Sequence, residues 1–186
     1  MTTLSIFNQS QPETPCTVTD NPEKIRELLA KHGVRFEQWP TRELPANASQ
    51  DDILTAYRDE VEKLKAECGF KTADVVSLNP DNPQKGAFRQ KFLDEHVHKE
   101  DEVRFFVRGQ GLFYLHIDDQ IFAVMCEKND LISIPDGTRH WFDMGPEPEF
   151  TCIRLFSNPD GWVADFTGED IAARFPRYEA LAGVLQ

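Results

Sequence analysis

Apolar residues recur with helical spacing in two stretches of the first 70 residues. The first stretch begins at Asn21-Pro22, a capping residue followed by a proline suited to a first helical turn, and it stops at Gly33. The second begins near Ser49, carries apolar side chains down one face, and ends before Gly69. This part of the chain is therefore predicted to be mostly helical.

From Ala73 onward the pattern changes to short apolar segments separated by Gly, Pro, Asn and Asp. Such segments are typical of the strands of a β-sandwich or barrel, and Asp118-Asp119 fits a tight hairpin turn between two of them. The predicted strands are Asp74–Leu78, Phe88–Phe92, Val103–Val107, Leu112–Ile117, Gln120–Met125, Leu131–Ile134 and Phe150–Phe156.

After residue 162 the spacing becomes helical again, and packing positions are expected at Ile171, Phe175, Tyr178 and Leu181. With 186 residues and 40% hydrophobic content, the chain can bury one core. We therefore expect one domain over residues 1–186. In it, 1–70 would be a mostly helical N-terminal addition, 73–157 the β-barrel core and 158–186 a helical C-terminal tail.

The formal net charge of −12 and the pI of about 4.8 exclude partners with anionic surfaces, because such a protein repels nucleic acid and acidic membranes. Residues 1–10 lack a basic start, and no stretch approaches the roughly 20 apolar residues of a membrane span. Reduced thiols in the cytoplasm are expected, because no metal-ligand or disulfide spacing connects Cys16, Cys68, Cys126 and Cys152. A monomer is the expected state.

Three of the five histidines lie in two short blocks beside strand-like sequence. In a strand, residues i and i+2 point to the same face, so His96 and His98 are aimed at one point. Four residues of extended chain would carry Glu102 about 13 Å away, so it must return by a reversal over residues 99–101. His140 would complete the group from a distant strand.

Neutral imidazoles and a carboxylate suit Fe, Ni, Mn, Co or Zn, whereas Ca and Mg prefer mostly oxygen ligands. Three nitrogens and one oxygen are also not a structural zinc set. Four protein ligands around an octahedral ion leave two adjacent positions open, which suits a bidentate oxygen substrate. We therefore predict a mononuclear metal centre formed by His96, His98, Glu102 and His140.

The same residues resemble the two signature motifs of the cupin superfamily, here His96-x-His98-x3-Glu102-x6-Gly109 and Pro135-x-Gly137-x2-His140. The chain around them is similar to the acireductone dioxygenase family of the methionine salvage pathway. Two positions depart from the cupin pattern: no glycine lies six residues before His96, and Asn129 holds the place of a glycine before Pro135. Asn tolerates positive φ, so the second departure is mild.

The resemblance implies a mainly β cupin fold, a double-stranded β-helix or jelly-roll barrel, with flanking helices at both ends. It also implies one Fe(II) or Ni(II) per chain. The substrates would be O2 and the acireductone 1,2-dihydroxy-3-keto-5-methylthiopentene. In the family, the Fe(II) form gives formate and 4-methylthio-2-oxobutanoate, and the Ni(II) form gives formate, carbon monoxide and 3-methylthiopropionate. The Irving–Williams trend favours Ni over Fe, so cellular supply would decide occupancy.

Two arginines are candidates for substrate contact. Arg104 shares the parity of Glu102 in an extended strand and so should point into the same site; the family resemblance implies a catalytic role for it. Arg154 shares the side of a strand with Cys152 and Phe150, which is an unusual place for a charge unless it meets an anion.

Three aromatic residues and two acids complete the candidate site. Phe92, Phe142 and Trp162 could wall an apolar substrate pocket, although aromatic residues at strand positions often fill a core instead. Glu95 and Asp101 flank the metal ligands and could orient their imidazoles, although surface acids are common in so acidic a chain.

Two other functions fit the same ligands. A different cupin enzyme, such as a sugar isomerase or another dioxygenase, would keep the metal centre and change the walls around it. A non-catalytic module would use the barrel only to bind a small ligand, but it would have no need for all four metal ligands.

Overall fold

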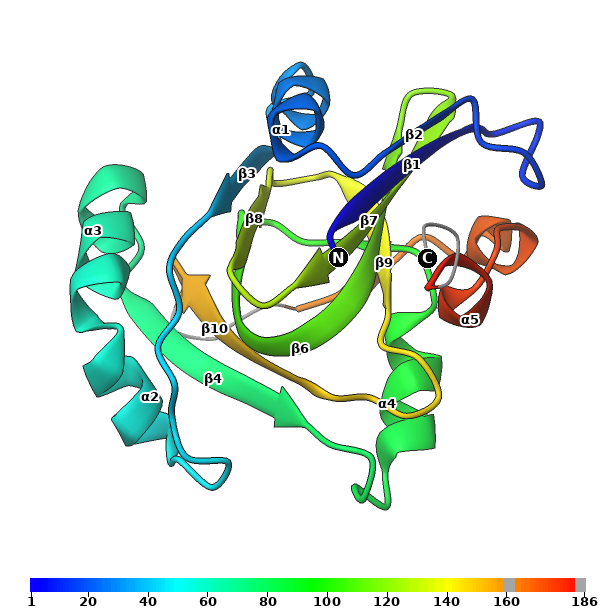
Figure 1. Ribbon diagram of the computed structural model, residues 1–186. Helices are drawn as coiled ribbons and strands as arrows, with labels where there is room; N and C mark the ends of the chain where they lie inside the picture. The colour runs from blue at the N-terminus through cyan, green and yellow to red at the C-terminus, as the bar shows by residue number, and fades with distance from the viewer. Residues whose placement is uncertain (159–162, 183–186) are drawn as a thin grey trace.

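The computed structural model describes residues 1–158 and 163–182. Its strands join into one 11-stranded sheet, with antiparallel pairing throughout, that curls into a barrel (Figure 1). In chain order the elements are β1 (Thr3–Asn8), β2 (Thr17–Thr19), α1 (Pro22–Ala30), β3 (Arg35–Gln38), α2 (Gln50–Ala56), α3 (Arg58–Cys68), β4 (Thr72–Leu78), α4 (Lys85–Phe92), β5 (His96–Val97), β6 (Glu102–Ile117), β7 (Gln120–Glu127), β8 (Asp130–Ile134), β9 (Arg139–Asp143), β10 (Phe150–Phe156), β11 (Asp165–Phe166), a 3-10 helix (Ile171–Arg174) and α5 (Tyr178–Leu181).

The long strand β6 belongs to both walls of the barrel. Its first half, from Glu102 to Gly109, pairs with β8 and β10, and its second half, from Gln110 to Ile117, pairs with β7 and β9. One wall therefore has the order β11-β5-β9-β6-β7-β1-β2, and the other has the order β4-β10-β6-β8-β3. In Figure 1, β6 sweeps around the barrel and connects the two walls.

Two glycines allow β6 to pass from one wall to the other. Gly109 has a φ of 69°, and a Cβ there would lie 1.7 Å from the carbonyl oxygen of Glu149. At Gly111 a Cβ would lie 2.3 Å from the ring of Phe142. Because no side chain fits at either position, this corner of the barrel requires glycine.

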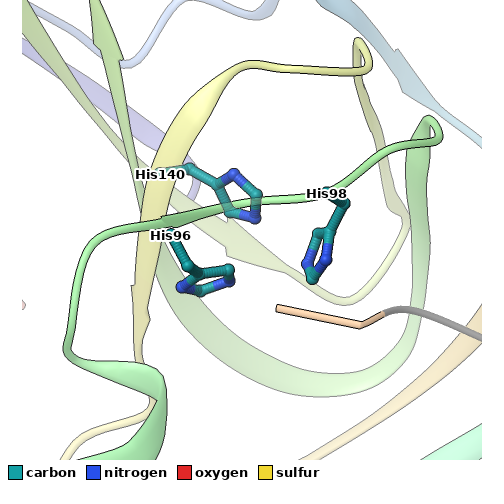
Figure 2. A group of neighbouring side chains, drawn as sticks. All are labelled: His96, His98 and His140. Carbon is teal, nitrogen blue, oxygen red and sulfur yellow. The ribbon is translucent and has the colours of Figure 1, made fainter. Parts of the chain in front are cut away.

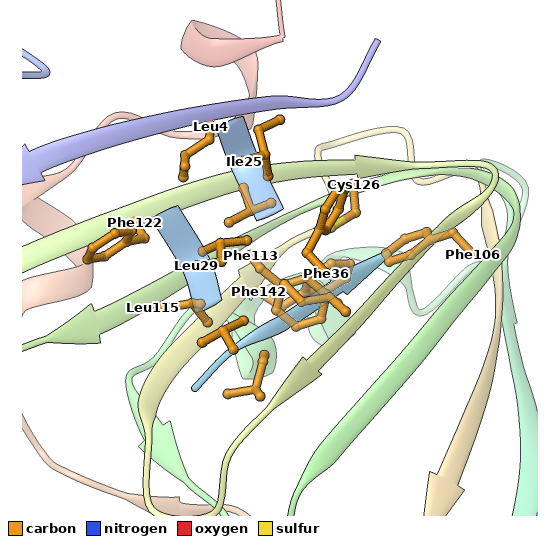
Figure 3. Packing of buried hydrophobic residues seen from close by; sticks show 14 of the residues in the cluster. Leu4, Ile25, Leu29, Phe36, Phe106, Phe113, Leu115, Phe122, Cys126 and Phe142 are labelled. Atoms are coloured by element: carbon orange, nitrogen blue, oxygen red, sulfur yellow. The ribbon is translucent and has the colours of Figure 1, made fainter. Parts of the chain in front are cut away.

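Side chains on both faces of the barrel strands are buried. The interior is filled by a cluster that α1 closes with Ile25 and Leu29 (Figure 3). A second cluster packs α2 and α3 on the outside of β6 and β10, and a third packs the C-terminal segment on the outside of β7 and β9. Burial on both faces explains why the sequences of these strands are nearly continuous runs of apolar residues.

The helices before residue 70 largely follow the prediction. The helix α1 begins after Asn21, whose side chain accepts a hydrogen bond from the backbone N–H of Lys24. The predicted second helix is divided at Tyr57 into α2 and α3. The Tyr57 ring is fully buried and its hydroxyl accepts a hydrogen bond from the backbone N–H of Arg42, which fixes this residue outside helical geometry.

The predicted strand Phe88–Phe92 is wrong, because this segment is the C-terminal part of the helix α4. Phe88 and Phe92 are four residues apart, so in a helix they lie on one face, and their rings stack with centroids 6.3 Å apart. The segment was too short for its apolar spacing to distinguish a helix from a strand.

Other differences concern pairing partners. The expected strands Val103–Val107 and Leu112–Ile117 are parts of the single strand β6. Before residue 70, β1 and β3 pair with β7 and β8, so this segment supplies strands to the sheet as well as helices. After residue 162, the described part holds the short strand β11 besides the 3-10 helix and α5. None of the helices in the described ranges has the length and apolar character that a membrane crossing requires.

Candidate metal centre

Three histidines converge at one end of the barrel (Figure 2). His96 lies in β5, His98 follows that strand directly, and His140 lies in β9, where it is the Cα partner of His96. Each ring offers one nitrogen, and the three nitrogens lie within 4.8 Å of one another. All three side chains are buried, with at most 7% of each residue exposed.

The loop after β5 returns the chain to this group, as the sequence predicted. It bends at Lys99 and Glu100, and β6 begins at Glu102. The backbone N–H of Gly137 donates to the carbonyl of His98 over 3.0 Å, which holds the loop against the segment that leads to β9. Asp101 supports the same contact, since its carboxylate accepts from the backbone N–H of Asp136.

Glu102 completes the group. Its Oε2 atom lies 2.8 Å from Nε2 of His140 and 3.3 Å from Nε2 of His98. Its other oxygen, Oε1, accepts a hydrogen bond of 2.7 Å from Nε of Arg104. The predicted set of three imidazoles and one carboxylate is therefore assembled in space.

Backbone carbonyls orient the three imidazoles. Nδ1 of His96 lies 2.8 Å from the oxygen of Asp94, Nδ1 of His140 lies 2.7 Å from that of Thr138, and Nδ1 of His98 lies 3.0 Å from that of Val163. A carbonyl oxygen can only accept, so each Nδ1 carries hydrogen and a neutral ring keeps its lone pair on Nε2.

This arrangement fits a bound cation. Nitrogen lone pairs and a carboxylate oxygen approach one another in a buried place, and such acceptors repel unless a proton or a metal lies between them. Three neutral imidazoles and one carboxylate match the ligand preference of Fe(II), Ni(II) and similar ions rather than that of Ca or Mg. The residues present are therefore suited to hold a transition metal.

The electrostatics of the group favour the ligand forms of two residues. Burial and the neighbouring His140 lower the pKa of His96 to about 4, so this ring is neutral at neutral pH. Burial would raise the pKa of Glu102, but Arg104 and His140 hold it well below its ordinary value, so the carboxylate is ionised. At His98, burial opposes the charged ring, yet the hydrogen bond and charge of Glu102 raise its pKa.

Arg104 points into the site, as its parity with Glu102 predicted. Only 7% of the residue is exposed, and its guanidinium lies over the rings of Phe113 and Phe142 at 5.5 and 5.1 Å. Phe92 reaches Phe142 from α4, with ring centroids 6.4 Å apart. Two of the three predicted aromatic residues therefore contact each other, and one of them, Phe142, packs on Arg104. Trp162 lies outside the described residues.

Glu95 and Arg154 make side-chain hydrogen bonds to partners other than His96, His98 and His140. Glu95 is almost fully buried, and its carboxylate binds Nδ1 of His116 at 2.5 Å and accepts from the hydroxyl of Thr167. Arg154 makes a bidentate ion pair with Asp74 on the neighbouring strand β4. The anion that Arg154 meets in the structure is thus a carboxylate of the protein.

Several contacts at the site had no signal in the sequence. Backbone carbonyls can come from any residue, so Asp94, Thr138 and Val163 could not be identified as partners of the imidazoles. Phe166 lies on β11, which pairs with β5, and its ring is 5.8 Å from that of His96. Only the presence of a strand near residue 165 would have pointed to this contact.

Comparison with known proteins agrees with the geometry. The model of the ARD/ARD' family matches residues 3–164. Relatives named acireductone dioxygenase are 73% identical in Marinobacter nauticus and 62% identical in Hahella chejuensis; the alignments cover 98% and 97% of this chain and 99% and 98% of the relatives.

A solved structure is also similar: an acireductone dioxygenase from Bacillus anthracis with a cadmium ion in its active centre. It is 31% identical, the match covers 89% of this chain and 98% of that one, and the TM-score is 0.79. The match confirms the expected mainly β, cupin-type jelly-roll barrel with flanking helices.

Proposed function

Since the chain belongs to the acireductone dioxygenase (ARD/ARD') family, we propose that it cleaves an acireductone with O2 at the centre formed by His96, His98, Glu102 and His140. The observation that carries this proposal is the approach of Nε2 of His98 and His140 to Oε2 of Glu102, with Arg104 on the other carboxylate oxygen. The site therefore combines a set of proposed metal ligands with the buried guanidinium of Arg104, whose positive charge suits an anionic substrate.

Each residue has a distinct proposed task. His96, His98, Glu102 and His140 would hold an Fe(II) or Ni(II) ion, which would supply Lewis-acid polarisation of the enediol substrate. The guanidinium of Arg104 favours loss of the second enediol proton, because a positive charge nearby stabilises the dianion. The dianion is the electron-rich form that reacts with O2. Phe142 and Phe113, packed on the guanidinium, limit the water around it and so strengthen its field.

The proposed substrate is 1,2-dihydroxy-3-keto-5-methylthiopentene, an intermediate of methionine salvage. The Fe(II) form would give formate and 4-methylthio-2-oxobutanoate, and the Ni(II) form would give formate, carbon monoxide and 3-methylthiopropionate. The four ligands suit both ions, so the metal supplied by the cell would set the products. Apolar rings such as Phe92 and Phe142 are suited to the methylthio end of this substrate.

We further propose that the enzyme is a cytoplasmic monomer. The four cysteines are free, which supports a reducing compartment. Within the described chain, the large apolar side chains that are exposed are few, namely Met1, Val18, Val163 and Phe166. Light scattering after size exclusion tests the monomer directly.

Anaerobic reconstitution tests the function. Metal-free protein is loaded with Fe(II) or Ni(II), mixed with acireductone and O2, and assayed for formate and carbon monoxide. We expect formate from both forms and carbon monoxide from the Ni(II) form alone. His140→Gln should abolish both products, whereas the matched control His32→Gln should not, since His32 packs on Phe122 away from the centre. No formate from either loaded form ends the assignment.

A further inference from the structure

The helix α4 is only weakly fixed by apolar packing. It has no fully buried residue, and its N-cap residue Gln84 makes no side-chain capping hydrogen bond in the described chain. Phe88 and Phe92 are only partly buried against the interior cluster. The position of α4 therefore depends on polar contacts, and α4 leads directly into β5, which carries His96.

One arginine on α4 makes most of those contacts, and Lys85 adds an ion pair with Glu147. Arg89 binds Asp143 in a bidentate manner, from Nε over 2.8 Å and from Nη2 over 3.1 Å. It also binds Glu179 of α5 with Nη1 and Nη2, over 2.9 and 2.7 Å. The inner carboxylate belongs to a residue with 0% exposure, whereas the Glu179 side chain is 51% exposed. The two halves of this network thus differ sharply in burial.

Asp143 is a rigid anchor for this contact. It is the last residue of β9, and its carboxylate also accepts from the backbone N–H groups of Gly145 and Tyr178, each over 3.0 Å. A buried carboxylate with four donors has little freedom to move. Arg89 therefore ties α4 to a fixed point on the strand that also carries His140.

The two ends of this ion pair lie close in the chain to two aromatic residues that contact each other, Phe92 and Phe142, and Phe142 packs on Arg104. Arg89 and Phe92 are three residues apart on α4 and so are neighbours on the helix, and Asp143 directly follows Phe142. The Phe142 ring contacts Phe92 on one side and the guanidinium of Arg104 on another. A shift of α4 along β9 would thus move Phe92 relative to Phe142.

We infer that the Arg89–Asp143 pair is a positioning device that sets Phe92 against Phe142 and so selects for the methylthio end of the substrate. Arg89 itself does not touch the substrate and acts through Phe92. The inference rests on the proposed function, because it assigns the two rings to the apolar end of an acireductone. It adds a specificity-determining pair that lies behind the site rather than in it.

Arg89→Lys is the first test, because it keeps a cation next to buried Asp143 but loses the planar fork that makes the bidentate contact. The variant is loaded with Fe(II), and its metal content is matched to the wild type. Steady-state kinetics are measured with the methylthio substrate and with an acireductone that carries a methyl group in place of the methylthioethyl tail. Glu179→Gln, which changes only the exposed half of the network, is the matched control.

We expect Arg89→Lys to raise KM for the methylthio substrate roughly tenfold, the range for a misfitted apolar group. The kcat should change less than about twofold, and the short-tailed substrate should behave as with the wild type. Glu179→Gln should match the wild type with both substrates. Equal losses on both substrates, no change in selectivity, or the same loss in Glu179→Gln would overturn the inference.

A double-mutant cycle with Phe92→Ala tests whether Arg89 acts through the ring. If it does, Arg89→Lys has no further effect on selectivity once Phe92 has been truncated. Independent, additive effects of the two changes would contradict the inference even if each lowers selectivity alone. A wild-type enzyme that accepts neither acireductone would instead contradict the proposed function, so the two failures are distinguishable.

Discussion

His96 and His140 are direct cross-strand partners, the paired residues of β5 and β9, and their ring centroids lie 4.4 Å apart. This pairing brings two proposed ligands together from distant parts of the chain. Burial, and after it the nearby His140 ring, disfavours charge on His96, whose pKa falls to about 4. The same contact therefore forms part of the proposed metal site and, together with burial, keeps one of its proposed ligands unprotonated.

Glu102 should be essential for metal retention. Glu102→Gln removes the only negative charge among the four ligands, so we expect affinity for Fe(II) or Ni(II) to fall by at least about 10- to 100-fold, the loss seen when even an outer partner of a metal site is changed. Metal per chain, measured after dialysis against a set free-metal concentration, checks this. Asp101→Asn is the matched control, since Asn can still accept from Asp136. Unchanged stoichiometry in Glu102→Gln would remove Glu102 from the ligands.

Arg104 should matter for turnover rather than for metal content. Arg104→Ala removes the charge that is proposed to favour the substrate dianion, and loss of one such group typically lowers kcat by about 10²- to 10³-fold. Metal content should stay near that of the wild type, because Arg104 binds Oε1 of Glu102, whereas the other oxygen, Oε2, faces the imidazoles. Metal analysis and O2 uptake on the same sample check both parts. A large loss of metal would make Arg104 a support of Glu102 instead.

The corner of β6 should not tolerate a side chain. Gly109→Ala combines a left-handed φ with a clash against the Glu149 carbonyl, so we expect a loss of about 2–5 kcal/mol in the free energy of unfolding. Gly69→Ala is the matched control, because Gly69 has a φ of 76° with no atom within 4 Å of the added Cβ. That change should cost only about 1–2 kcal/mol. Urea unfolding of both variants decides the matter; equal losses would show that the close approach to Glu149 is unimportant.

Asp130 should make stability depend on pH. It is fully buried in the structure, where Thr2 and Gln38 donate to its carboxylate, and burial raises its pKa above the ordinary 3.8. The folded protein thus holds this proton more tightly than the unfolded chain, so the contribution of Asp130 to stability is greatest below the ordinary pKa and falls as pH rises through the raised one.

Asp130→Asn cannot titrate, so the comparison of the two proteins isolates this effect. As pH rises above the ordinary pKa of 3.8, the free energy of unfolding of the wild type should decline relative to that of Asp130→Asn, by at most about 1.4 kcal/mol per pH unit, and should level off above the raised pKa. Urea unfolding at several pH values measures the difference. A difference that stays constant, or that moves in favour of the wild type, would contradict the raised pKa.

The sequence predicted how His96, His98 and Glu102 come together because the relations among these residues are local. The i, i+2 relation of His96 and His98, the reversal before Glu102 and the parity of Arg104 all depend on a few neighbouring residues, and the structure has each of them in the predicted relation. The capped start of α1 at Asn21 was likewise predictable, because a helix cap is formed by residues close together in the chain.

Features that depend on partners far away in the chain could not be predicted from the sequence in the same way. The alternation around Arg154 correctly implied an anion, but the anion is Asp74, which comes from a strand far away in the chain. Phe88 and Phe92 could have alternated in a strand or shared a face of a helix, and only the contact of α4 with β9 selects the helix. The spacing of residues in the sequence does not determine these tertiary contacts.

The participation of β6 in both walls of the barrel has a consequence for how the protein opens. A barrel of two separate sheets could part along the boundary between them, but here the boundary is crossed by one continuous strand that begins at Glu102. The amide hydrogens of β6 should therefore exchange with solvent only when the whole domain unfolds, so partial opening leaves the proposed ligand Glu102 in place.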